Sequence, residues 1–210
     1  MISGQNIVRV PRTKFLGISL DENRSWKYHI DYICNKISKW IGILLRARQV
    51  LFGQTLIMLY NTLIKPHFIY GITIWGNTYK KYIHRLHLIQ KKAIRIINYS
   101  EFCAHTGPLF EKMKLMTIYD LHEYFSGILI YNGLHKKLPF SMCDFFTRST
   151  HERNANLRSL YFRKKFTQFS IKSVGPRLWN SFPINCKQST SLYSFKKLLR
   201  NHIFHRQMTD

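Results

Sequence analysis

Residues 79–98, YKKYIHRLHLIQKKAIRIIN, decide the fold because their apolar and basic side chains separate onto opposite sides of a helix. Apolar residues recur at three- and four-residue spacing, and the opposite side is basic, interrupted only by Leu88. The apolar side consists of Tyr79, Ile83, Leu86, Ala93, Ile94 and Ile97. The basic side consists of Lys81, His84, Arg85, Lys91, Lys92 and Arg95. This stretch predicts a long amphipathic helix that packs on other helices.

An earlier stretch shows the same separation. Ser25 is a residue type that caps helix N-termini, and the helical period starts directly after it. The expected inward residues are Trp26, Ile30, Ile33, Ile37, Trp40, Ile41 and Leu44. The opposite side of this helix is basic, because it carries Lys36, Lys39 and Arg46.

Further helices are expected along the rest of the chain. One covers 54–65 and is broken or kinked by Pro66, whereas 68–75 fits either a helix or a buried strand. Two more cover about 109–114 and 118–135, the second capped by Thr117 with Asp120 three residues on. The last covers about 191–204, with Lys196, Lys197 and Arg200 outward.

Short stretches of β character flank these helices. Residues 7–10 and 14–20 read as strands separated by a Pro-Arg-Thr turn, and 166–173 alternates like another strand. We therefore expect a mainly α fold with an N-terminal β-hairpin, a helical bundle and a smaller α+β C-terminal region with one or two short strands. The expected division is a hairpin at 1–24, a bundle at 25–100, connecting helices at 101–136, a loop at 137–156 and a basic C-terminal region at 157–210.

Positive charge dominates the chain. Its 33 Lys and Arg outnumber 10 Asp and Glu, giving a net charge of +23. No acidic residue occurs in 32–100 or in 153–209, which carry 11 and 12 Lys or Arg. An ordinary surface mixes both signs, so we expect a nucleic acid to neutralise the basic helix faces. The competing interpretation is a solvated face with no partner.

The residues give little support for catalysis, cofactors or metals. The 10 acidic residues are scattered along the chain, and the sequence gives no sign of the acidic residues held close together that two-metal polymerases and nucleases need. His84 and His87, His202 and His205, and Cys103 with His105 lack the paired ligand spacing of structural zinc sites. We expect no metal, no cofactor, no small-molecule substrate and no catalytic residue.

The expected location is inside the cell, in the nucleus or the cytoplasm. Four widely spaced cysteines favour free thiols over disulfides, and the N-terminus lacks the apolar run of a signal peptide. The most membrane-like stretch, 50–76, is interrupted by polar residues and falls short of the roughly 20 apolar residues that a span needs. No membrane partner is expected, and the sequence leaves the oligomeric state open.

Several segments spread along the chain form a recognisable series. The segments are KFLGISLDENRSWKYHI at 14–30, IKPH at 64–67, YGITIWG at 70–76, LIQKKAIRII at 88–97, AHT at 104–106, PLF at 108–110, GPRLWNSFP at 175–183 and SFK at 194–196. Together they resemble the C-terminal part of reverse transcriptases from LINE-type, jockey-like non-LTR retrotransposons. They occur in the order found in that family and cover nearly the whole chain.

The resemblance implies a fragment without polymerase activity of its own. The family's catalytic aspartates lie in a palm motif of the type [FY]-A-D-D upstream of the FLG segment, and no such motif occurs here. The first strands resemble the end of the palm, residues 25–100 resemble the thumb, and the remainder resembles the C-terminal extension.

A thumb holds the RNA template and the growing strand through their backbones. The implied partner is therefore RNA or an RNA–DNA duplex. The candidate phosphate contacts are Lys36, Lys39, Arg46, Lys81, Arg85, Lys91, Lys92 and Arg95. Two other functions stay open: a free-standing basic RNA-binding structural protein, and a protein that binds membrane surfaces through basic amphipathic helices.

Overall fold

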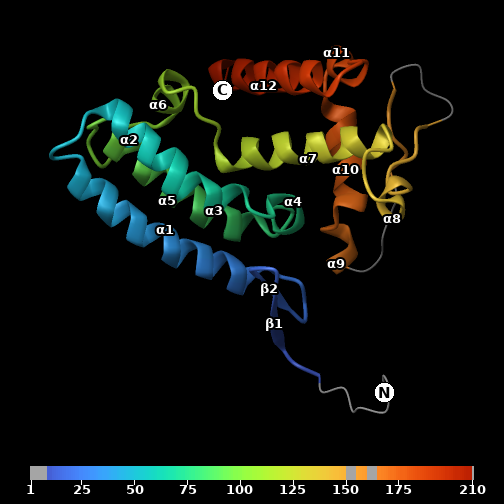
Figure 1. Cartoon of the computed structure of the whole chain (residues 1–210), viewed down its shortest axis with the longest axis horizontal. Coiled ribbons are helices and arrows are strands. Elements are labelled where there is room, and N and C mark those ends of the chain that lie inside the picture. The colour runs from blue at the N-terminus through green and yellow to red at the C-terminus, as the bar shows by residue number, and fades with distance from the viewer. Residues whose placement is uncertain (1–8, 150–154, 160–164, 210) are drawn as a thin grey trace.

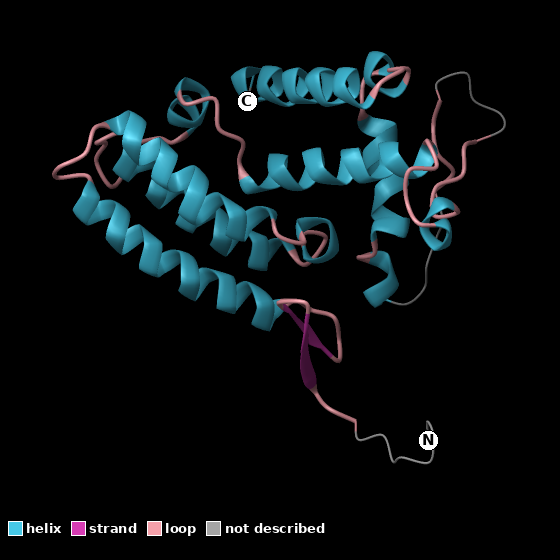
Figure 2. Ribbon diagram, in the orientation of Figure 1, coloured by secondary structure: helices cyan, strands magenta, loops and turns pink. Residues whose placement is uncertain are grey.

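The computed structural model describes residues 9–149, 155–159 and 165–209 (Figure 1). Helices account for most of the described chain, and one antiparallel hairpin is its only sheet (Figure 2). The prediction of a mainly α fold with an N-terminal hairpin is confirmed. In chain order the elements are β1 (Arg12–Phe15), β2 (Ile18–Asp21), α1 (Lys27–Ala47), α2 (Gly53–Leu59), the π-helical segment η1 (Tyr60–Ile64), α3 (Lys65–Ile69), α4 (Ile72–Trp75), α5 (Lys80–Ile97), α6 (Gly107–Lys112), α7 (Ile118–Leu134), α8 (Phe140–Cys143), α9 (Lys165–Gln168), α10 (Ile171–Ser181), α11 (Ile184–Lys187) and α12 (Leu192–Thr209).

Helix α7 joins two hydrophobic cores. Ile118 and Leu121, in its first half, belong to a core that includes α1, α2, η1, α3, α4 and α5. Ile130 and Tyr131, in its second half, belong to a core with α10 and α12. In Figure 1, α7 accordingly runs between the α1–α5 bundle and α12, while α10 crosses it. The expected domain boundaries stay a prediction.

The hairpin turn lies at Leu16 and Gly17, not at the predicted Pro-Arg-Thr segment. Thr13 belongs to β1 and pairs with Leu20 of β2. Leu16 and Gly17 both have positive φ values, 45° and 78°, as a tight two-residue hairpin turn requires. Glycine adopts such values at little cost, so the Leu-Gly pair was the signal that the prediction missed. The expected strand at 7–10 falls partly outside the described residues, and Val10 itself is not in a strand.

The start of α1 also differs from the prediction. Trp26 rather than Ser25 occupies the N-cap position, in a left-handed conformation with φ of 60°. Asp21 at the end of β2 accepts hydrogen bonds from the backbone nitrogens of Ser25 (3.0 Å) and Trp26 (3.1 Å). A carboxylate from the preceding strand therefore ties the hairpin to the residues that lead into α1, and the N-cap residue itself makes no side-chain cap hydrogen bond.

Residues 53–69 form one continuous helical arm whose middle turn is wider than an α-helix. In η1 the backbone nitrogen of Lys65 donates to the carbonyl of Tyr60, five residues back. Pro66 follows directly and cannot donate a backbone hydrogen bond, so the π turn absorbs the interruption without ending the arm. Leu56, Ile64 and Phe68 remain on one buried side.

The YGITIWG segment at 70–76 fastens this arm to the hairpin and to α7. The Tyr70 hydroxyl donates to the carbonyl of Leu16 (2.6 Å), and the buried Trp75 indole donates to the carbonyl of Tyr70 (2.8 Å). Gly71 has a φ of 63°, which favours glycine. A methyl group at Gly76 would overlap the His122 ring of α7. Both glycines of this segment therefore have structural reasons, and 72–75 is a helix rather than a strand.

The predicted strand at 166–173 is wrong. Residues 165–168 form α9, and Ser170, with extended backbone, precedes α10. A strand needs a hydrogen-bonded neighbour, and no strand lies beside this segment in the described chain. Ile171, Val174 and Leu178 recur at helical spacing, a longer signal than the short alternation used for the prediction. Beyond the hairpin, β pairing in the described chain is limited to one bridge, between Arg148 and Leu157.

Candidate nucleic-acid interface

Helix α5 presents its basic side to solvent because its apolar side packs in the core that it shares with α1, α2, η1, α3 and α4. Ile83, Leu86, Ala93, Ile94 and Ile97 are buried as predicted. Tyr79 is an exception: it precedes the helix and is 41% exposed, with its ring against Phe169 at 4.8 Å between centroids.

Gln90 is a buried polar residue on this apolar side that the sequence prediction missed. Its side-chain nitrogen donates to the Tyr60 hydroxyl (2.8 Å) and to the Met116 carbonyl (3.0 Å). Its side-chain oxygen accepts from the backbone nitrogen of Ile118 (2.8 Å). One amide thus fixes α5 against η1 and the start of α7, which holds the basic side of α5 in a set orientation.

Only part of the basic side of α5 is free to bind a ligand. Lys81 and Lys92 are exposed and Lys91 is half-buried, and none of the three has an acidic partner in the described chain. Arg85 forms an ion pair with Asp31 of α1, and this hydrogen bond raises its pKa. The Nε of Arg95 donates to the carbonyl of Ala104 (2.9 Å). Two of the predicted contacts therefore hold neighbouring segments together.

The predicted residues on α1 lie on a different flank of that helix. Asp31 faces α5, whereas Lys36 and Lys39 line a groove with His67 of α3. The Lys36 ammonium lies 5.1 Å from the centre of the Tyr32 ring and lowers the pKa of the Tyr32 phenol. Arg46 is exposed near the end of α1. The structure therefore places Lys36 and Lys39 on a surface other than the basic side of α5.

A second basic surface involves residues that the sequence prediction did not bring together. A groove of about 980 Å³ lies between α6, α7 and α12, and we call it the α6–α12 groove. Its five lining cations are Lys112, Lys114, Lys196, Lys197 and Arg200. Its aromatic lining residues are Tyr124, Tyr193 and Phe204. The sequence indicated this surface only through the outward basic residues of 191–204. The other two groove cations, Lys112 and Lys114, come from about 80 residues earlier in the chain.

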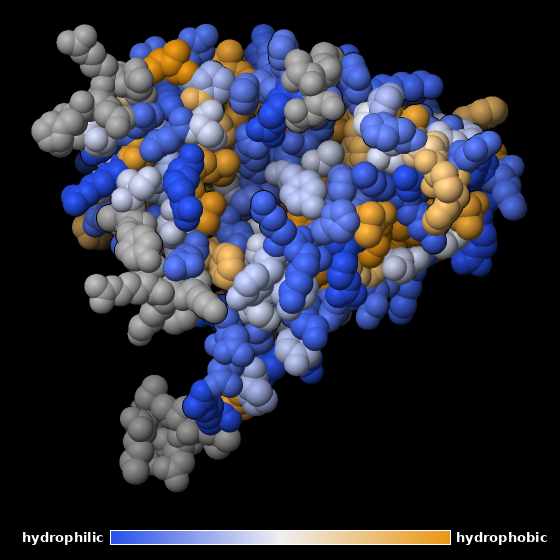
Figure 3. Space-filling view, turned by 180° about the vertical axis from the view of Figure 1, so that it is seen from behind, coloured by the Kyte–Doolittle hydropathy of each residue, from blue (hydrophilic) through white to orange (hydrophobic). Residues whose placement is uncertain are grey.

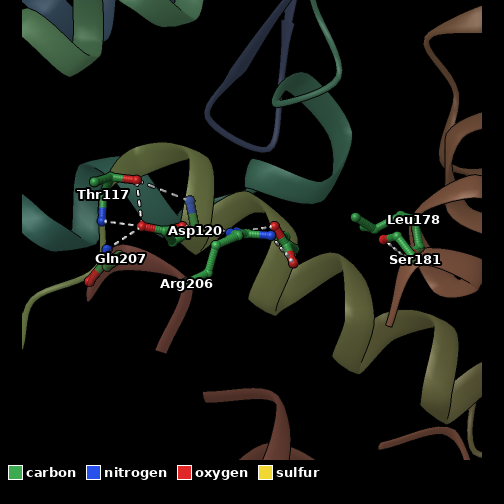
Figure 4. Close-up of polar contacts among 7 residues, drawn as sticks. Thr117, Asp120, Leu178, Ser181, Arg206 and Gln207 are labelled. Carbon is green, nitrogen blue, oxygen red and sulfur yellow. Dashed lines mark hydrogen bonds and ion pairs between the residues drawn. The ribbon is translucent and has the colours of Figure 1, made fainter. Parts of the chain in front are cut away.

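Helix α12 is held beside this groove by an ion-pair network with α7 (Figure 4). The Arg206 guanidinium contacts Glu123 through two nitrogens (2.7 and 3.2 Å) and Asp120 through one (3.3 Å). Asp120 also accepts from the backbone and the hydroxyl of Thr117, which completes the predicted capping box. Gln207 donates to the same carboxylate. Two of the few acidic residues are thus used to dock α12.

Three partly or fully buried histidines make stability depend on pH. Burial lowers the pKa of His29, His87 and His122 to about 4, from an ordinary value of 6.5. The unfolded chain therefore binds three protons between pH 6.5 and 4 that the folded chain does not bind. Stability is retained above pH 6.5 and is lost as the pH falls through this window. We expect a loss of about 1 to 2 kcal/mol per histidine after solvent screening.

Urea unfolding at neutral pH and near pH 4 measures this loss. A His122→Asn variant removes one of the three groups and should lose less stability between the two pH values than the unaltered chain. Equal pH dependence of the variant and the unaltered chain would show that His122 is not responsible.

The described residues also bear on metals and membranes. Nowhere among them do three His, Cys, Asp or Glu side chains come close enough to hold a metal ion. None of the helices in the described ranges combines the length and the apolar character needed to cross a bilayer. On the face shown in Figure 3, hydrophobic residues lie in separate patches among hydrophilic ones.

Comparison with known proteins finds distant homologues among the RNA-directed DNA polymerases of Drosophila mobile elements. The chain is 28% identical over 110 residues to the probable RNA-directed DNA polymerase from transposon X-element of Drosophila melanogaster, across 51% of this chain and 12% of that protein. It is 21% identical over 147 residues to the RNA-directed DNA polymerase from mobile element jockey of the same species, across 65% and 16%. The jockey polymerase of Drosophila funebris is 24% identical over 123 residues, across 57% and 13%.

No family model and no solved structure matches the chain. The matched part spans only 12% to 16% of the length of these relatives. The chain's distant homologues are thus non-LTR retrotransposon reverse transcriptases, matched over roughly half of the chain or somewhat more.

Proposed function

We propose that this chain is a non-catalytic part of a LINE-type reverse transcriptase that binds the backbone of an RNA–DNA duplex as a thumb does. The observation that carries the proposal is the basic side of α5. There, Lys81, Lys91 and Lys92 lack acidic partners in the described chain, on a helix whose other side is anchored in the core. Cations held on a rigid helix suit phosphate contacts that position a duplex without reading its sequence.

The names of the distant homologues support the same proposal, because each is an RNA-directed DNA polymerase. The sequence itself contains no [FY]-A-D-D motif. In the proposal, the polymerase aspartates belong to a part of such an enzyme that this sequence does not include.

The full chain, incubated with a primed RNA template, Mg²⁺ and deoxynucleotides, should not extend the primer. Primer extension by the purified chain would contradict the non-catalytic assignment.

Binding is tested with Lys81, Lys91 and Lys92 changed together to Gln. Loss of three phosphate contacts should weaken binding to an RNA–DNA duplex by about tenfold or more at physiological salt, for all sequences alike. Fluorescence anisotropy with a labelled duplex measures the affinity.

The matched control changes Lys27, Lys136 and Lys137 to Gln, three exposed lysines outside α5. This control removes the same total charge and should lose little affinity. Equal losses in both variants would mean that only net charge matters. Binding to single-stranded RNA or to anionic vesicles, but not to the duplex, would favour one of the two other functions.

A further inference from the structure

We infer that the α6–α12 groove is a separate binding site for an unpaired nucleic-acid strand. The groove does not include the basic side of α5, so the inference goes beyond the proposed function and can fail independently of it. Three features carry the inference: a net positive charge, an exposed aromatic ring and a concave shape.

The charge of the groove is positive and largely uncompensated. Five cations line it against one acid in the described chain, Glu111, which leaves a net charge of +4. None of the ion pairs in the described chain involves a groove cation. The pKa of Lys65 in α3 is lowered, first by the burial of its side chain and second by the positive charge of Arg200, so Lys65 lies close to this cation. Such a concentration of like charge is favoured when a polyanion occupies it.

Three basic residues lie between two aromatic residues along one stripe of α12. Tyr193, Lys196, Lys197, Arg200 and Phe204 recur at three- and four-residue spacing and all line the groove. The stripe from Tyr193 to Phe204 is roughly 16 Å long at the helical rise, enough for several nucleotides. The Arg200 guanidinium lies 5.5 Å from the centre of the Phe204 ring, so a cation and a ring face share one site.

The aromatic rings favour an unpaired strand over a duplex. Tyr193 is 78% exposed, which leaves its ring available for stacking. Bases in a duplex already stack on one another, whereas unpaired bases stack on protein rings while their phosphates contact cations. The concave shape, with Tyr124 in one wall, also suits a strand better than a flat membrane surface.

Lys114 contributes to the groove from an unusual backbone position. It follows α6 with a φ of 50°, and its backbone nitrogen donates to Glu111 while that of Leu115 donates to Phe110. This is the hydrogen-bond pattern of a helix end where glycine is preferred. A Lys114→Gly variant therefore removes the charge and also places glycine, the preferred residue, at a left-handed backbone position.

The test measures binding of labelled single-stranded RNA of about 12 nucleotides to the full chain and to variants. Changing Lys196, Lys197 and Arg200 together to Gln should lower affinity about tenfold or more. It should also reduce the slope of log affinity against log salt concentration by roughly 2. Tyr193→Ala should lower affinity about tenfold with an unchanged slope, and Tyr193→Phe should bind like the unaltered chain. Lys114→Gly should bind more weakly although its melting temperature is equal or higher.

The controls separate this site from the α5 surface and from other anions. The variant with Lys81, Lys91 and Lys92 changed to Gln should keep its affinity for single strands, and the groove variant should keep its affinity for the RNA–DNA duplex. Single-stranded DNA of the same sequence should bind through the same residues. Tighter binding of RNA than of DNA would indicate that the groove also contacts the 2′-hydroxyl groups.

Three results would overturn the inference. The first is unchanged affinity for single strands in the triple groove variant or in Tyr193→Ala. The second is an equal loss of single-strand affinity in the groove and α5 variants. The third is binding of polyglutamate or of phosphatidylserine vesicles through the groove as tightly as RNA, because this would show a general anion surface.

Discussion

Arg206→Ala is expected to lower the free energy of unfolding by about 3 to 5 kcal/mol. The reason is that Asp120 and Glu123 are only 8% and 14% exposed, so both carboxylates would lose their cationic partner in a largely dehydrated place. The same change removes the ion pairs between the end of α12 and the first half of α7, and of this network only the hydrogen bond from Gln207 to Asp120 still joins the two helices. Urea unfolding followed by circular dichroism measures the loss.

Arg206→Lys is the matched control for this result. Lysine keeps the positive charge but lacks the planar fork that contacts Glu123 through two nitrogens. The lysine variant should therefore retain part of the lost stability. If Arg206→Ala were as stable as the unaltered chain, the ion pairs would be only surface contacts, and the apolar side of α12 and the Gln207 hydrogen bond would be enough to hold it.

Trp75→Ala is expected to lower the free energy of unfolding by a similar amount, about 3 to 5 kcal/mol. The Trp75 side chain is fully buried and lies edge-on against the His29 ring, at 5.8 Å between centroids. Its indole also donates to the Tyr70 carbonyl. The variant would therefore leave a large cavity and an unpaired carbonyl where the hairpin, α1 and α4 meet.

Trp75→Phe separates these two effects. Phenylalanine fills most of the cavity but cannot donate the hydrogen bond, so its loss should be closer to 1 to 2 kcal/mol. Chemical unfolding of both variants checks the order of stability. A Trp75→Ala variant within 1 kcal/mol of the unaltered chain would contradict the packing described here.

Periodicity predicted the long helices because their apolar sides meet a core over several turns. Helix α5 and the capped start of α7 match the prediction closely, and Trp26 is buried as expected. Short elements were less predictable. The strand expected at 166–173 rested on a few alternating residues, too few to distinguish a strand from a turn of helix.

The candidate sites show the same limit at the level of side chains. Sequence alone identified Lys81 and Lys92 as outward, because exposure follows from helical spacing. It could not show that Arg85 is paired with Asp31 or that Arg95 holds Ala104, because these contacts depend on tertiary packing. The α6–α12 groove was missed for the same reason, since Lys114 and Lys197 line one groove only when α12 docks on α7.

The central claim is that cations on α5 contact the phosphates of an RNA–DNA duplex. The most direct test is the salt dependence of duplex binding, with Lys81, Lys91 and Lys92 changed together to Gln. Each lost phosphate contact should reduce the slope of log affinity against log salt by roughly one unit, so the slope should fall by roughly two to three. A slope equal to that of the unaltered chain would show that these lysines are solvated surface residues and would contradict the account.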